Sequence, residues 1–109
     1  MSVIVTTTFG FEGQRIREYK GIVRGIVVRT PTISQGFFGG LQALFGGTNQ
    51  SFTEMCEQAR QEAYVLLLQH ALDRGANAIV GLRYDASDSN VGTEVLCYGT
   101  AVVIEPIAA

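Results

Sequence analysis

A single long amphipathic helix in the middle of the chain, with extended segments on both sides, constrains the fold more than any other feature. Apolar residues recur at spacings of three and four at Phe52, Met55, Cys56, Ala59, Ala63, Leu66, Leu67 and Ala71. Ser51 opens an S-x-x-E capping box, and Gly75 stands where a left-handed C-cap ends a helix. The pattern predicts a helix over 52–74. Because Tyr64, Val65 and Leu68 add apolar surface beside this stripe, we expect the helix to pack on two sides.

The segments that flank this helix are typical of strands. They are rich in β-branched residues and run over Val3–Thr8, Arg15–Arg29, Ala76–Asp85 and Val91–Ile104. Gly21 and Gly25 interrupt the second segment and indicate a bend, a bulge or a close backbone approach. The last two segments are neighbours in sequence and are expected to form a hairpin. The order β-β-short α-long α-β-β predicts an α+β fold in which a mostly antiparallel sheet carries the long helix.

The size and charge of the chain indicate one domain with part of its surface hidden. A length of 109 residues predicts a single domain over 1–109. Only 17% of the residues are charged, against about 25% in typical soluble domains. Ile22 and Ile26 share one parity of their strand, and Val23 and Val27 share the other, so we expect both faces of that strand to be covered.

A stretch without charge, between Arg29 and Glu54, indicates self-association. It holds large apolar residues among glycines, and those residues are Phe37, Phe38, Leu41, Leu44 and Phe45. The stretch is too short and too rich in glycine to span a bilayer, which takes about 20 apolar residues. We expect these five residues to form a short helix and an oligomer interface between copies of the chain.

The overall charge argues against nucleic acid and membrane surfaces as partners. The net charge is −2 and the isoelectric point is near 5.2, so no positive field attracts polyanions. The first residues carry neither a basic region nor a long apolar run, so a secretory signal is not expected. We therefore expect a cytoplasmic protein that neither binds nucleic acid nor spans a membrane.

Metal-ligating residue types are few. Cys56 and Cys97 lie far apart in the sequence without C-x-x-C spacing, and His70 is the single histidine. Cys56 and Cys97 are the candidate ligands for a soft transition metal, because two thiolates from neighbouring elements favour such ions. The alternative is that both are small buried hydrophobic residues, which is the more frequent role of free cysteines. His70 is more typical of a hydrogen-bonded structural residue than of a catalytic base, because no motif supplies a partner.

Basic residues concentrate in the segment Arg15–Arg29. Arg17, Lys20 and Arg24 are the candidates for binding an anion, for example at the junctions of a ring. The alternative is pairing with carboxylates across neighbouring strands, which is the commoner fate of such charges.

Several stretches resemble the YbjQ family, a bacterial group often described as heavy-metal-binding without an established activity. The sequence that carries the resemblance is GANAIVGLRYD at 75–85, supported by IREYKGIVRG at 16–25, GTAVV at 99–103 and FGG at 45–47. The resemblance covers nearly the whole chain and implies a dodecin-like α+β subunit that assembles as a homopentamer. It implies no catalytic residues.

These observations favour a homo-oligomeric, non-enzymatic module with a structural or ligand-binding role. The resemblance adds a soft-metal binder using Cys97, with Cys56, as an alternative. A third hypothesis is an enzyme acting on a small anionic metabolite at subunit junctions, with Arg17, Arg24 or Tyr19 orienting it.

Overall fold

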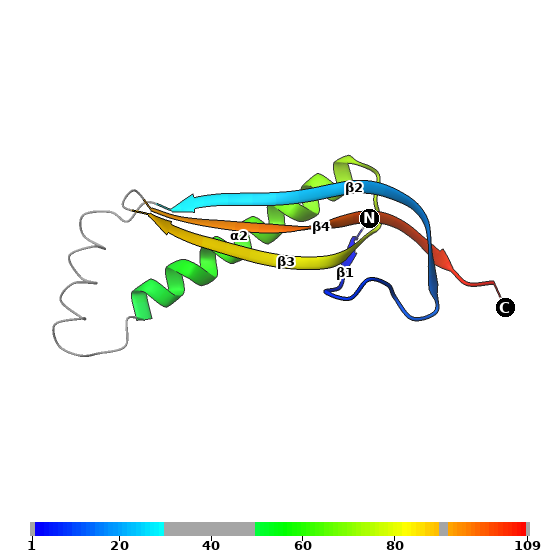
Figure 1. Cartoon of the computed structure of the whole chain (residues 1–109), viewed down its shortest axis with the longest axis horizontal. Helices are drawn as coiled ribbons and strands as arrows, with labels where there is room; N and C mark the ends of the chain where they lie inside the picture. The colour runs from blue at the N-terminus through cyan, green and yellow to red at the C-terminus, as the bar shows by residue number, and fades with distance from the viewer. Residues whose placement is uncertain (1, 30–49, 90–91, 109) are drawn as a thin grey trace.

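The computed structural model describes residues 2–29, 50–89 and 92–108. Its elements, in chain order, are β1 (Ile4–Val5), β2 (Gln14–Arg29), α2 (Gln50–Asp73), β3 (Ala78–Ser89) and β4 (Gly92–Pro106). Within these ranges one helix packs on a four-stranded sheet of order β1-β3-β4-β2, which confirms the predicted α+β class (Figure 1). The short helix and the interface predicted from Phe37 to Phe45 lie outside the described residues.

The sheet is built around β4. This strand pairs antiparallel with β2 on one side and with β3 on the other, so the predicted hairpin of the last two strands is confirmed. β1 pairs parallel with β3 and spans two residues, which is shorter than the predicted Val3–Thr8. The Thr6 hydroxyl accepts a hydrogen bond from the Thr8 N–H at 3.1 Å, and the Thr8 hydroxyl donates to the Gly10 carbonyl at 2.9 Å. These local bonds interrupt the regular strand after Val5, although the Thr6 and Thr8 backbone still bonds to β3.

The helix ends where the sequence predicts and begins slightly earlier. Gly75 has φ 78°, its N–H donates to the Leu72 carbonyl at 2.9 Å, and the Ala76 N–H donates to the Ala71 carbonyl at 3.0 Å. This pair of bonds is a Schellman motif. At the other end α2 begins at Gln50, so Ser51 lies inside the first turn. The prediction that Ser51 stands before the helix is therefore wrong, and glutamine, a good helix former, extends the helix.

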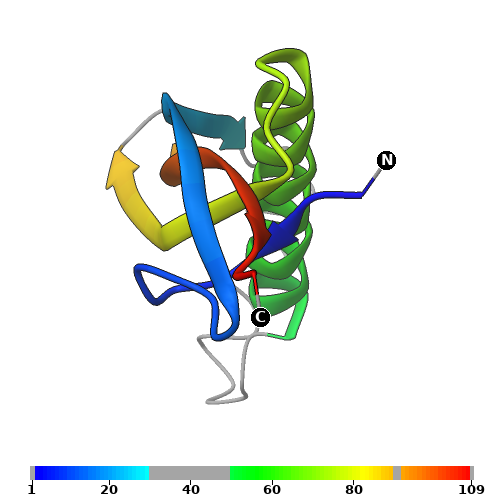
Figure 2. The ribbon, with the colours of Figure 1, turned by 90° about the vertical axis from the view of Figure 1, so that its right-hand side faces the viewer.

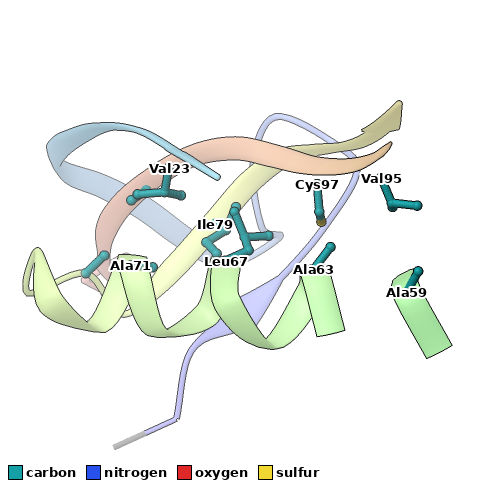
Figure 3. Close-up of a cluster of buried hydrophobic side chains, with 10 residues drawn as sticks. Val23, Ala59, Ala63, Leu67, Ala71, Ile79, Val95 and Cys97 are labelled. Carbon is teal, nitrogen blue, oxygen red and sulfur yellow. The ribbon is translucent and has the colours of Figure 1, made fainter. Parts of the chain in front are cut away.

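The main core lies between α2 and the sheet. The buried stripe of the helix consists of three alanines and one leucine at intervals of four, Ala59, Ala63, Leu67 and Ala71 (Figure 3). They pack on Val23, Ile79, Val95 and Cys97 from the sheet. Leu66 was predicted in this stripe but is 48% exposed, because a stripe of period four shifts slowly around the helix and leaves Leu66 on its outer side.

The sheet has a second, smaller core on the face away from the helix. Ala78, Val80, Val102 and Ile104 are buried there, with Phe11 and Ile16 packed against them. This cluster occupies the half of the sheet near the β1–β2 connection. Among residues 2–29, 50–89 and 92–108, no layer covers the rest of that face.

The remaining surface, here called the open face, is the side of β2, β4 and β3 that points away from α2 beyond this cluster (Figure 2). The register places on it Ile22, Arg24, Ile26 and Val28 of β2, Glu94, Leu96, Tyr98 and Thr100 of β4, and Arg83, Asp85 and Ser87 of β3. Ile22 is 72% exposed and Val28 is 61% exposed. The described residues therefore do not meet the prediction that both faces of this strand are covered.

The two glycines of β2 confirm the predicted irregularities. The register between β2 and β4 shifts between Tyr19 and Gly21, where Gly21 adopts φ 95°. Gly25 lies against α2 so closely that a Cβ atom there would stand 1.9 Å from the Ala63 carbonyl oxygen. No helix among the described residues is long and apolar enough to cross a membrane.

Candidate functional site

Four ion pairs occur among the described residues, and all of them involve the basic residues of β2. Arg15 and Arg17 lie beside Glu105, with the Arg17 contact at 3.9 Å. Lys20 binds Glu18 at 2.9 Å, and Arg29 contacts Glu62 of the helix. The hydrogen bond and the charge of Lys20 lower the pKa of Glu18. Two members of the predicted anion set, Arg17 and Lys20, therefore lie beside carboxylates.

The third member, Arg24, lies in a different setting on the open face. In the register Arg24 stands opposite Tyr98, and Tyr98 stands opposite Arg83 on the next strand. Residues directly opposite in an antiparallel ladder share a face with Cβ atoms about 5 Å apart. Arg24, Tyr98 and Arg83 therefore form one row across three strands, here called the arginine row. The predicted set did not include Arg83 or Tyr98.

Arg83 is held in place without a carboxylate. Its Nη1 donates to the Thr7 carbonyl at 2.9 Å and to the Leu82 carbonyl at 2.7 Å. The guanidinium carbon lies 5.8 Å from the centre of the Phe9 ring, within reach of a cation–π interaction. Phe9 in turn lies close above Gly81, where φ is 68° and an added Cβ would come within 3.1 Å of the ring. These contacts hold the Arg83 guanidinium beside the Thr7–Phe9 segment, on the outer side of β3.

The outer edge of β3 is covered in one half of the sheet. Thr6 and Thr8 carbonyls accept from the N–H groups of Leu82 at 3.0 Å and Gly81 at 2.8 Å, so the segment after β1 covers β3 up to Leu82. Beyond Leu82, the rest of β3 has no strand on its outer side among the described residues.

His70 of α2 and Arg74, which directly follows the helix, cover the middle of β2. The Arg24 N–H donates to Nδ1 of His70 at 3.1 Å, and Nη1 of Arg74 donates to the Lys20 carbonyl at 3.0 Å. His70 is thus a hydrogen-bonded structural residue, as its sequence context favours, with the proton on Nε2. Beyond Arg24, no described strand pairs with the outer edge of β2.

A second polar group lies between the helix and β3. Arg60 lies 5.7 Å from the centre of the Tyr84 ring. Burial, together with the neighbouring Cys97 thiol, raises the pKa of Tyr84 to about 12. Burial also raises the pKa of Cys97, which the Tyr84 hydroxyl partly offsets. Both groups are therefore neutral at physiological pH, and the Cys97 thiol is a poor nucleophile.

The two cysteines are both reduced. Cys97 is fully buried in the main core, and Cys56 is half-buried on the helix. Among the described residues, no cluster of three or more histidine, cysteine, aspartate or glutamate side chains is arranged to hold a metal ion. His70 bonds to β2 rather than joining either thiol.

The outer side of α2 is also apolar. Val65 is 51% exposed and Leu66 is 48% exposed, and both line a shallow depression together with Gln61 and Glu62. The described residues do not meet the prediction that the helix packs on two sides: Tyr64 and Leu68 pack against the same core as the main stripe, and no described residue covers the outer side.

Comparison with known proteins gives a consistent family. Residues 3–105 match the family model YbjQ_1, described as "Putative heavy-metal-binding". The chain is 54% identical to a UPF0145 protein of Legionella pneumophila, covering 95% of this chain and 100% of that protein. It is 52% identical to a UPF0145 protein of Chromobacterium violaceum, covering 96% and 91% of the two chains.

A solved structure shares the fold. It is a protein of unknown function from Pediococcus pentosaceus, assigned to the DUF74 family, with a TM-score of 0.65 and 20% identity over 94% of this chain and 98% of that one. At this identity the likeness concerns the fold alone. The match over nearly the whole length and the high identity to the UPF0145 relatives agree with the sequence resemblance, and the chain belongs to the YbjQ family.

Proposed function

We propose that this chain is a homo-oligomeric module without catalytic activity, which assembles as a closed ring and serves a structural or ligand-binding role. The observation that carries the proposal is the apolar part of the open face, where Ile22, Ile26 and Val28 are 72%, 43% and 61% exposed. Fully burying an aliphatic side chain of this size stabilises by about 1.5–3 kcal/mol. Covering the three side chains together therefore offers several kcal/mol to an assembly.

The strand edges suggest how copies would meet. The uncovered part of β2 ends at Arg29, opposite Thr93, and the uncovered part of β3 ends at Ser89, opposite Gly92. Both therefore lie at the same end of the sheet, on its two opposite sides. An unpaired edge offers N–H and C=O groups to a strand of another chain. Pairing the β2 edge of one copy with the β3 edge of the next would satisfy both.

Such a contact is heterologous, because two different surfaces of the subunit meet. Heterologous contacts repeat around an axis and give a ring when the rotation closes. The pentamer implied by the family resemblance is a ring of this kind. A second copy is the occupant favoured here, because each subunit carries both halves of the contact.

The outer side of the helix supports the same proposal. The depression lined by Val65 and Leu66 gives each copy a second apolar area that a neighbour could cover. The sequence's shortage of charge, 17% of residues, agrees with surface that is hidden in an assembly.

Val28→Lys tests the proposal. The residue lies on the open face near the free end of β2, and the substitution removes apolar area and places an ammonium in the proposed contact. The matched control is Ile107→Lys, a residue of similar exposure, 58%, beyond the last strand at the other end of the sheet.

We expect native mass spectrometry to give single subunits or smaller assemblies for Val28→Lys and the wild-type mass for Ile107→Lys. Circular dichroism on both variants checks that each remains folded. An unchanged assembly in folded Val28→Lys would reject this surface as the contact.

A further inference from the structure

One flank of α2 runs along the free edge of β2. The helix crosses the sheet diagonally, from the side of β3 at its first residues to the side of β2 at its end (Figure 1). Gly25 of β2 lies directly against it, because an added Cβ there would stand 1.9 Å from a helix carbonyl oxygen. Two contacts mark the flank that faces β2: Glu62 contacts Arg29, and His70 accepts from the Arg24 N–H.

The apolar depression of α2 lies on this flank, between the two contacts. Leu66 follows Glu62 by one helical turn and precedes His70 by one turn, so its side chain leaves the same side of the helix. Leu66 is 48% exposed and lines the depression with Val65 and Gln61. The depression therefore borders the free edge of β2.

Backbone donors of β2 point outward beside this depression. The Arg24 N–H points away from β4, because it donates to His70 of the helix rather than to a strand. Alternation along an antiparallel ladder places the N–H groups of Ile26 and Val28 on the same outer side. No described strand pairs with β2 on that side. The edge therefore offers two N–H donors to an incoming strand.

The free edge of β3 carries a complementary surface. Tyr84 and Ala86 stand opposite Cys97 and Val95, which belong to the main core, so their side chains lie on the helix side of the sheet. Both residues are exposed. Arg60 of α2 lies over the Tyr84 ring and has no ion pair among the described residues. This edge thus presents apolar surface and a cation, whereas the flank beside β2 presents apolar surface and a carboxylate.

A ring fixes the direction in which the two edges meet. β2 and β3 both run antiparallel to β4, so they are parallel to each other within one subunit. Neighbouring copies in a ring of three or more are related by a rotation of at most about a third of a turn, which cannot reverse a strand. β3 of the next copy therefore runs parallel to β2, and its helix lies on the same face of the joined sheet.

We propose that the free edge of β3 of the next copy pairs with β2 and rests against the depression of α2, so that Tyr84 and Ala86 of that copy cover Leu66. The inference rests on the proposed assembly and specifies its contact. Arg60 of the next copy then approaches the Glu62 carboxylate, and complementary charges favour the correct register over others. A second copy is the occupant because one chain carries both edges.

One local hydrogen bond must exchange when the edges pair. In the single subunit the Ala86 N–H donates to Oδ1 of Asp85 at 3.0 Å. A carbonyl of β2 replaces this acceptor in the joined sheet, and the Asp85 carboxylate returns to water. Because Asp85 is exposed, the exchange of one acceptor for another has a small net free energy.

Hydrogen exchange at single amides, measured by NMR, tests the pairing. We expect the Ile26 and Val28 amides to exchange at least about a hundredfold more slowly in the wild-type assembly than in single subunits. The internal reference is the pair of amides at Gly25 and Val27, which point toward β4 and stay protected in both states.

Leu66→Lys provides the single subunits, because it places an ammonium in the depression against the incoming strand. The matched control is Leu72→Lys, a residue that is 38% exposed and lies about 120° around the helix from Leu66. We expect native mass spectrometry to give single subunits or smaller assemblies for Leu66→Lys and the wild-type mass for Leu72→Lys. Circular dichroism checks that both variants remain folded.

The outcomes separate this contact from the assembly itself. A wild-type ring in which the Ile26 and Val28 amides exchange as fast as in single subunits overturns the paired edge and leaves the proposed assembly standing. An unchanged mass for folded Leu66→Lys also overturns the contact. A wild-type protein that is found only at 11.8 kDa rejects both proposals.

Discussion

The close approach of β2 to α2 at Gly25 yields a prediction with a definite magnitude. A Cβ atom at this position would stand 1.9 Å from the Ala63 oxygen and 2.8 Å from the Leu67 nitrogen. Ordinary contact begins near 3.4 Å, so strand and helix would have to separate by about 1.5 Å. Both neighbours are helix backbone, which cannot rotate away as a side chain can.

Separation on this scale loosens the packing of Val23 against Ala63 and Leu67, which are fully buried. Overpacking of a dense core costs about 1–3 kcal/mol and sometimes more. Replacing glycine by alanine recovers about 0.4–1 kcal/mol by restricting the unfolded chain. Because helix backbone must move, the cost lies at the upper end of this range, about 3 kcal/mol. We therefore expect Gly25→Ala to destabilise the protein by about 2 kcal/mol, which lowers the melting temperature by roughly 8 °C for a chain of this size.

Thermal unfolding followed by circular dichroism measures this effect, with all samples at one protein concentration because assembly shifts melting temperatures. The control is Gly10→Ala, where an added Cβ meets nothing within 4 Å. Its melting temperature should stay within about 2 °C of wild type. If Gly25→Ala has the same melting temperature as Gly10→Ala, the reasoning about the close approach of β2 and α2 is refuted.

Three further predictions concern titration, thiol reactivity and the edge of β2. Because burial raises the pKa of Tyr84 from 10.0 to about 12, its neutral form contributes stability that is complete below pH 10 and is lost as the pH rises toward 12. Tyr84→Phe should remove this loss of stability in urea titrations at alkaline pH, and an unchanged dependence of stability on pH would contradict the prediction. Cys56 should react with a maleimide in the folded protein while Cys97 reacts only on unfolding, as mass spectrometry of labelled peptides can report; early labelling of Cys97 would conflict with its burial. His70→Ala should accelerate hydrogen exchange at the Arg24 amide, measured by NMR, while the amides of β4 exchange as in wild type; equal protection in the variant would show that His70 does not cover the edge.

The elements that could be predicted from the sequence are those whose signals are local. The spacing of Ala59, Ala63 and Leu67 depends only on the helical period, and Gly75 ends the helix through its own φ angle. The two glycines of β2 likewise carried a local signal, since each was expected to mark a bulge or a close approach. The structure assigns the bulge to Gly21 and the close approach to Gly25.

The candidate site was harder to predict because it depends on register. The sequence placed Arg17, Lys20 and Arg24 in one candidate set, but a register shift between Tyr19 and Gly21 interrupts the alternation of faces along this strand. A second shift, between Val80 and Arg83, decides which residue of β3 faces Tyr98. No local pattern gives these shifts, since they arise from pairing between distant strands. Glycine at position 81 was the available signal that β3 bends there.

The central claim is that copies of this chain cover one another's exposed apolar surface. Native mass spectrometry of the untagged protein at micromolar concentration tests it most directly. The account predicts an assembly at an integer multiple of 11.8 kDa, about 59 kDa for a ring of five copies. A folded, soluble species at 11.8 kDa alone would contradict it.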